Sequence, residues 1–279
     1  MNHCLSGRNY HSLFEDKAYL NIVMPALKTP KTMVRRICGN YYDEKYNLID
    51  FFDALELIKG YESAVFKISK GTGHGRGVRV FNNSSYTDAL KSYGNDFVVQ
   101  EILVQHPKLA YFNESSVNVV RITSICLDGE VYILGAILRI GAPGAFCDHQ
   151  AIGNVGYRNI GLDREGYFHK RALDIDNGDI FNDIFGKPIP KEPCPHYKEM
   201  VKAIVTNHKR FPDYGIIGWD FTVDKDDEVV CIEMNTRNPG VIASQYVLGP
   251  IFGQFTKEGQ SIKNRIMKIG INIKNRVYI

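Results

Sequence analysis

Residues 218–235 of the chain read GWDFTVDKDDEVVCIEMN. Two short apolar, β-branched runs, residues 218–223 and 229–235, flank residues 224–228, which are too highly charged to bury. Runs of this kind joined by a polar connector are typical of a β-hairpin. We therefore predict two antiparallel strands with a solvated turn, and this hairpin anchors the interpretation of the rest of the chain.

Three oxygen-bearing side chains fall on one face of the predicted hairpin. Glu233 and Asn235 are two residues apart on the second strand, so their side chains point the same way, and Asp220 on the first strand can join them. Such a set suits Mg²⁺ held jointly by protein and phosphate oxygens. The alternative is a solvated acidic hairpin. The metal site is favoured because Glu233 lies in an apolar strand, where an unpaired carboxylate is costly to bury.

A glycine-rich segment precedes this hairpin in the chain. Residues 70–77, KGTGHGRG, lie between two predicted strands, residues 64–69 and 78–81. Glycines let backbone amides approach an anion closely. Because the segment leads into a strand, it is neither a Walker loop nor a dinucleotide fingerprint, both of which lead into a helix. A mobile turn is the alternative, but Lys67 in the preceding apolar strand needs a counter-charge, and a phosphate supplies one.

The middle of the chain predicts a junction between lobes and a long hairpin. A helix over residues 84–93 and a strand over residues 96–104 lead to Gln105-His106-Pro107, where a small lobe would join a larger one. The pair Asp128-Gly129 marks a hairpin between residues 117 and 140. Arg121 and Arg139 lie in its strands. Each suits a local ion pair, and beside a Mg²⁺ site both would favour a phosphate or carboxylate.

The remaining segments complete the predicted organisation. Residues 1–60 are predicted to be helical and rich in loops, and the glycine-rich residues 141–161 a loop that shapes a substrate site. Residues 196–211 have the spacing of an amphipathic helix, with His208 as a packing residue. Beyond about residue 259 we predict a solvated basic helix.

Composition limits the class of protein. The 279 residues are 44% hydrophobic and 23% charged, as in a folded globular protein, and the net charge of +3 is too small and dispersed for nucleic acid. The sequence has no membrane span and no signal peptide, which suggests a cytoplasmic enzyme. The six cysteines form no CxxC pair, so we expect reduced thiols, and Cys194 with His196 lacks the second half of a zinc site.

Taken in order, these pieces resemble the ATP-grasp fold, and in particular its sugar-transfer-associated family. The resemblance covers residues 10–255 and rests on motifs whose order and spacing together are specific: FEDK at residues 14–17, VFK at 65–67 with the glycine flap, VVQE at 98–101, QHP at 105–107, SVNVVR at 116–121, LRIGAPG at 138–144, GWD at 218–220 and IEMN at 232–235.

The resemblance implies an α+β fold with two lobes that clasp ATP between antiparallel sheets. The expected division is an N-terminal segment (1–60), a small nucleotide-binding lobe (61–104) and a large lobe with the metal and substrate sites (105–279). Two Mg²⁺ ions would be bound by Asp220, Glu233 and Asn235, and Arg121 would meet the terminal phosphate. The residues implied to bind ATP are Lys67, Ser69, Gly71, Gly73, Gly75, Arg76, Gly77, Gln100, Glu101, Ile102, Leu103, His106 and Asn118.

The implied reaction is ATP-dependent ligation of a carboxylate to an amine through an acyl phosphate. Lys67, Arg121 and Arg139 are the catalytic candidates, Arg139 and Arg237 would hold the carboxylate, and Asp148 and His149 would orient the amine. An amino acid joined to a sugar acid for a surface polysaccharide is the expectation from the family association alone. A kinase of small molecules on the same scaffold and a nucleotide-binding protein without turnover are the alternatives.

Overall fold

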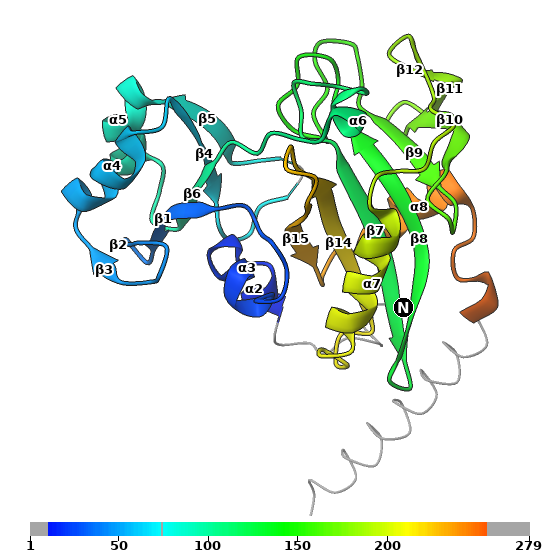
Figure 1. Ribbon diagram of the computed structural model, residues 1–279, viewed down its shortest axis with the longest axis horizontal. Helices are drawn as coiled ribbons and strands as arrows, with labels where there is room; N and C mark the ends of the chain where they lie inside the picture. The colour runs from blue at the N-terminus through cyan, green and yellow to red at the C-terminus, as the bar shows by residue number, and fades with distance from the viewer. Residues whose placement is uncertain (1–10, 74, 256–279) are drawn as a thin grey trace, which may run out of the picture.

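A computed structural model of the protein describes residues 11–73 and 75–255. Its frame is a pair of antiparallel β-sheets, one in each lobe (Figure 1). The small-lobe sheet has the order β3-β2-β1-β6-β4-β5, and the large-lobe sheet has the order β11-β10-β9-β8-β7-β14-β15. Sheets and helices together make an α+β fold, as the sequence predicted.

The small lobe packs two helices against its sheet. Its apolar core includes the buried rings of Phe66, Tyr86 and Phe97. Asp50 begins α4 by accepting a hydrogen bond from the Asp53 amide, which satisfies one of the free N–H groups of the first turn. The elements are β1 (Thr32–Ile37), β2 (Asn40–Tyr42), β3 (Leu48–Ile49), α4 (Phe51–Lys59), β4 (Ser63–Ile68), β5 (Val78–Asn82), η2 (Asn83–Ser85), α5 (Tyr86–Ser92) and β6 (Phe97–Glu101).

The large lobe is built on a core that α7 covers on one face of the sheet (Figure 1). Trp219 and Phe221, both fully buried, fill its centre. The elements are α6 (Pro107–Ala110), β7 (Val119–Leu127), β8 (Glu130–Ile140), β9 (Arg158–Leu162), β10 (Phe168–Asp174), β11 (Asp179–Phe181), β12 (Asp183–Ile184), β13 (Lys187–Pro188), α7 (Tyr197–His208), β14 (Ile216–Val223), β15 (Val229–Asn235), α8 (Val241–Leu248) and η3 (Gly253–Phe255).

The first sixty residues differ from the prediction. They contain the short helices α2 (His11–Phe14), η1 (Lys17–Tyr19) and α3 (Leu20–Val23), but β1, β2 and β3 then join the small-lobe sheet, with β1 paired to β6. The prediction missed β1 because the buried Arg35, in the middle of this strand, interrupts its run of apolar residues. Its guanidinium donates to the carbonyl oxygens of Ala18 and Asp43, which satisfies the charge inside the lobe.

Most other predicted elements agree with the structure, but residues 158–161 of the predicted loop belong to β9, which pairs with β8, and the strand predicted over residues 96–104 ends at Glu101. The hairpins at 117–140 and 218–235, the strands around the glycine flap and the helix at 196–211 are all present. The residues of the predicted basic tail lie outside the described part of the chain. Within the described ranges, no helix combines the length and the apolar character needed to cross a membrane.

Candidate functional site

A cleft of about 1260 Å³ separates the two sheets, and both lobes line it. From the small lobe come Lys67 and the glycine flap, and from the large lobe come strands β7, β8, β14 and β15. Residues 102–105 lead from β6 into the large lobe and form the wall at the junction. Clefts between lobes are common ligand sites, and this one has charged groups at its floor.

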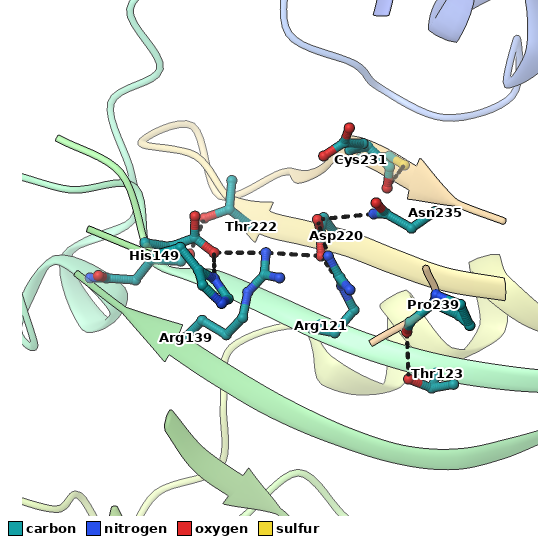
Figure 2. A network of polar contacts seen from close by, with 12 residues as sticks. Arg121, Thr123, Arg139, His149, Asp220, Thr222, Cys231, Asn235 and Pro239 are labelled. Atoms are coloured by element: carbon teal, nitrogen blue, oxygen red, sulfur yellow. Dashed lines mark hydrogen bonds and ion pairs between the residues drawn. The ribbon is translucent and has the colours of Figure 1, made fainter. Parts of the chain in front are cut away.

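Asp220 is at the centre of the charged floor. It lies directly across from Arg121 on β7 and from Glu233 on β15. The Arg121 guanidinium binds both carboxylate oxygens, with Nη2 at 2.8 Å from Oδ2, and Arg139 Nη2 lies 3.1 Å from Oδ1 (Figure 2). Burial opposes the charged form, but the two arginines outweigh it and lower the pKa of Asp220 to about 2.

Glu233 and Asn235 complete the predicted set of oxygen ligands. Glu233 lines the cleft and pairs with Lys17, whose Nζ lies 3.0 Å from Oε1. The Asn235 amide donates to Asp220 Oδ2 at 3.3 Å (Figure 2). Two carboxylates and one amide on adjacent strands are hard oxygen donors, so these residues fit Mg²⁺. In residues 11–73 and 75–255 no three His, Cys, Asp or Glu side chains gather as a metal site by themselves.

Lys67 and the flap form the opposite wall. Burial and the neighbouring charge of Lys17 lower the pKa of Lys67 to about 8. The flap folds back on its own strand, since the Ile68 amide donates to the Gly77 carbonyl at 2.9 Å. Gly77 has φ +68°, and a Cβ there would lie 2.7 Å from Ile68, so the turn requires glycine.

A second group of polar residues continues from Asp220 along the cleft. Arg139 Nη2 lies 2.7 Å from Asp148 Oδ2, and the His149 ring is next to the same carboxylate (Figure 2). Burial opposes ionisation of Asp148, but Arg139 prevails and lowers its pKa. The His149 ring packs on Tyr157 with 4.5 Å between ring centroids. The structure thus brings Arg139, Asp148 and His149 together, as the sequence predicted for the substrate end.

Most of the predicted site residues line this cleft. They are Lys67, Gly71, Gly73, Gly75, Arg76, Glu101, Ile102, Leu103, Arg121, Arg139, Asp148, His149, Asp220, Glu233, Asn235 and Arg237. Their common location follows from the pairing of strands, because β7, β8, β14 and β15 present alternate residues to the same face.

Asn118, which the sequence predicted to bind the nucleotide, is not among the residues that line the cleft. It directly precedes β7 and is fully buried. Its amide donates to the carbonyl oxygens of Leu109 (2.7 Å) and Asn113 (2.9 Å), so it fixes the loop before β7.

Four further predicted ligands lie outside the lining of the cleft. Ser69 is buried behind Lys67, and Gly77 is at the base of the flap. The side chain of Gln100 donates to Thr32 Oγ1 at 2.9 Å, between β6 and β1. His106 caps α6 by accepting from the Lys108 amide.

The N-terminal segment contributes cleft residues to which the sequence assigned no role. Besides Lys17, Glu15 lines the cleft, and its Oε1 accepts hydrogen bonds from the Arg237 amide (2.6 Å) and from Thr236 Oγ1 (3.2 Å). The Lys17 amide also donates to the Ser69 carbonyl at 3.1 Å. The FEDK motif was the available signal, but only tertiary structure brings it between the two lobes.

Comparison with known families decides the assignment. The profile of the sugar-transfer associated ATP-grasp family matches residues 85–257, more than half of the chain. The chain belongs to this family. A search of the curated proteins gives no significant match.

Solved structures similar to this ATP-grasp protein include three with TM-scores of about one half. Biotin carboxylase from Campylobacter jejuni, in a β-γ-ATP complex, has 17% identity and a TM-score of 0.50, over 91% of this chain and 45% of the other. D-cycloserine synthetase DcsG has 13% identity and a TM-score of 0.51, over 91% and 71%. VanG D-Ala:D-Ser ligase from Enterococcus faecalis has 15% identity and a TM-score of 0.51, over 86% and 56%.

These similarities establish the ATP-grasp fold. The chain spans between 40% and 45% of the length of three of the solved structures that it matches. Their activities therefore enter only as support for a proposal about this protein.

Proposed function

We propose that this protein is an ATP-dependent ligase that joins a carboxylate to an amine. The observation that carries the proposal is a single cleft in which Lys67 and the glycine flap lie opposite Asp220, Glu233 and Asn235. One wall offers cations and backbone amides to phosphates, and the other offers oxygens to a divalent cation. Membership of the ATP-grasp family and the ligases among the structural neighbours support the same reaction class.

ATP would bind with its base at the junction of the lobes and its phosphates over the charged floor. Residues 101–104 line the junction, with apolar groups from Ile102, Leu103 and Val104 to contact adenine. Lys67 and Lys17 would meet the phosphates from the small-lobe side. Asp220, Glu233 and Asn235 would hold Mg²⁺, which when bound neutralises charge on the phosphates.

The arginines of the large lobe would act on the reacting groups. Arg139 and Arg237 would hold the substrate carboxylate, and Arg121 would stabilise the γ-phosphoryl group as a carboxylate oxygen attacks it in line. Arg121 and Arg139 are held in place by Asp220, so their guanidinium groups are oriented before substrate arrives. This first step yields an acyl phosphate and ADP and requires no general base.

In the second step the amine attacks the acyl carbon. A C–N bond forms, the bond between the acyl carbon and the phosphate oxygen breaks, and inorganic phosphate leaves. An ammonium substrate loses two protons overall, one to the departing phosphate and one to solvent. Asp148 and His149 lie beside Arg139, where they would orient the incoming amine.

The family description supports a more specific proposal for the substrates and the biosynthetic role. An amino acid coupled to a sugar acid during surface-polysaccharide biosynthesis, in the cytoplasm, is the substrate class that we propose. A phosphoryl transfer that stops at a stable phosphate ester is the second candidate.

The test is ATP-dependent phosphate release, screened against amino acids crossed with uronic acids and analysed by mass spectrometry. Formation of an amide with one phosphate released per bond would support the ligase. A stable phosphorylated product would identify a kinase. Binding of ATP without turnover in any mixture would contradict catalysis and indicate a nucleotide-binding protein.

A further inference from the structure

Two of the carboxylates that line the cleft have no cation beside them among the described residues. Seven acidic side chains line the cleft, and five of them have a lysine or arginine nitrogen within 4 Å: Glu15, Glu101, Asp148, Asp220 and Glu233. Among the described residues, Asp176 and Glu114 have no such partner. A carboxylate in a cleft without a cation is suited to a cationic ligand.

The position of Asp176 is fixed by the turn between β10 and β11. The buried carboxylate of Asp174 accepts hydrogen bonds from the amides of Asp176 (3.2 Å) and Asn177 (3.3 Å) and from the Asn177 side chain (3.0 Å). Gly156 packs against the same carboxylate so closely that a Cβ would lie 1.9 Å from Asp174 Oδ2. Asp176 and Glu114 are both exposed, but among the described residues only the turn of Asp176 is held by such a network, which fixes Asp176 at the cleft.

The rings of Tyr157 and His149 connect Asp176 to the residues around Arg139. The Tyr157 hydroxyl donates to Asp176 Oδ1 at 3.0 Å, and His149 packs on the Tyr157 ring. All three side chains line the cleft. His149 in turn is next to Asp148, the partner of Arg139, so this group of residues adjoins the place proposed for the acyl phosphate.

We propose that Asp176, with Tyr157 and His149, binds the ammonium group of the amine substrate. An ammonium has three N–H donors, and the second oxygen of Asp176 can accept one of them at a charge-assisted strength. The face of an aromatic ring adds attraction for a cation. This inference rests on the proposed ligase function and identifies the amine substrate as one that arrives protonated.

Binding as ammonium is compatible with the reaction. The ammonium first loses the proton that faces Asp176 or His149 to solvent, which leaves a nitrogen lone pair that can attack the acyl carbon. The remaining steps are those described above, with one proton lost to phosphate and one to solvent. Asp176 selects the amine, and the acid and ATP sites lie on the Arg139 side of the cleft.

The experiment uses the full-length protein and the first amine that supports turnover in a panel of ammonia, the amino acids and hexosamines. Asp176→Asn should raise the KM for that amine by about 10-fold to 100-fold, the range for losing a charge-assisted hydrogen bond. The KM for ATP should stay within about twofold, because the ATP contacts are unchanged. Tyr157→Phe should raise the KM for the amine by a smaller factor.

Asp179→Asn is the matched control, because Asp179 is an exposed aspartate of the same hairpin that does not line the cleft. It should leave both KM values unchanged. The inference would be overturned if Asp176→Asn left the KM for the amine unchanged, or if it raised the KM for ATP by the same factor. Either result would leave the proposed ligase function intact. If wild type uses no amine in the panel, the proposed function itself fails, and the amine site with it.

Discussion

Lys17 and Glu233 form an ion pair in the cleft, with Nζ 3.0 Å from Oε1. The two residues come from the N-terminal segment and from β15, and both are largely shielded from solvent. Lys17 therefore places a positive charge beside Glu233, which we also propose to hold Mg²⁺. The pair links the first helices to the floor of the site.

Lys17 gives the first prediction. Lys17→Met should weaken ATP binding measured without metal by about tenfold or more, because a charged phosphate contact is lost. Adenosine, which has no phosphates, should bind as it does to wild type. Lys28→Met is the control, since Lys28 pairs with Asp224 and Glu228 outside the cleft. Isothermal titration with both ligands checks the result, and equal ATP affinities for wild type and Lys17→Met would refute it.

Lys67 predicts a pH dependence of ATP binding. Its pKa of about 8 means that the free protein loses the Lys67 proton as pH rises from 7 to 9. Phosphate favours the ammonium, so binding should take up a proton near pH 8 and metal-free ATP affinity should fall above it. Lys67→Met should bind ATP more weakly and lose this pH dependence. Titrations in buffers of different ionisation enthalpy measure the uptake, and a flat profile in wild type would count against the assignment.

His208 predicts a loss of stability in acid. Burial lowers its pKa, and the ring is held neutral because Nδ1 accepts from Ser124 Oγ while Nε2 donates to the Tyr214 carbonyl. The unfolded chain therefore binds the proton first, and stability falls as pH drops below about 6.5, the usual histidine value. His208→Gln should flatten this part of the profile. Urea unfolding from pH 7.5 to 5 tests the point, and identical slopes for both proteins would exclude a role for His208.

Asn118 predicts a stability effect without a binding effect. Asn118→Ala leaves the buried carbonyl oxygens of Leu109 and Asn113 without its donors, which should cost about 1–3 kcal/mol of unfolding free energy. ATP affinity of the folded variant should match wild type. Denaturant unfolding and titration of the same sample measure both quantities. A tenfold weaker ATP affinity with unchanged stability would instead restore Asn118 as a nucleotide ligand.

Local sequence patterns predicted the large lobe well. Hairpins such as 218–235 have apolar strands with a charged turn, so their pairing follows from short-range signals. The same period of two correctly puts Arg121 on one face and Asn118 on the other. The pattern did not indicate that the Asn118 side chain contacts the carbonyl oxygens of Leu109 and Asn113.

Long-range contacts account for what the sequence missed. A charged residue such as Arg35 is not expected in a buried strand, so β1 was not predicted. The carbonyl oxygens of Ala18 and Asp43 that accept hydrogen bonds from Arg35 are known only from the folded lobe. Likewise Lys17 meets Glu233, and Tyr157 meets Asp176, only after the sheets have formed. A residue that acts through such contacts has no local period or spacing to identify it.

Asp220 is a poor choice for testing the metal site by mutation. Its buried carboxylate neutralises Arg121 and Arg139, so Asp220→Asn should also cost several kcal/mol of stability. Glu233 is less buried than Asp220, with 22% of its side chain exposed against 4%, and its replacement by glutamine keeps the size and leaves the two arginines paired with Asp220. Glu233 therefore separates metal binding from folding.

The most direct measurement is the affinity for ATP with and without Mg²⁺ in wild type and Glu233→Gln. Glu228→Gln is the control, because Glu228 is an exposed glutamate in the turn of the same hairpin. We predict that Mg²⁺ strengthens ATP binding to wild type and Glu228→Gln, and that most of this gain is absent in folded Glu233→Gln. The same gain from Mg²⁺ in all three proteins would contradict the metal site on which the account depends.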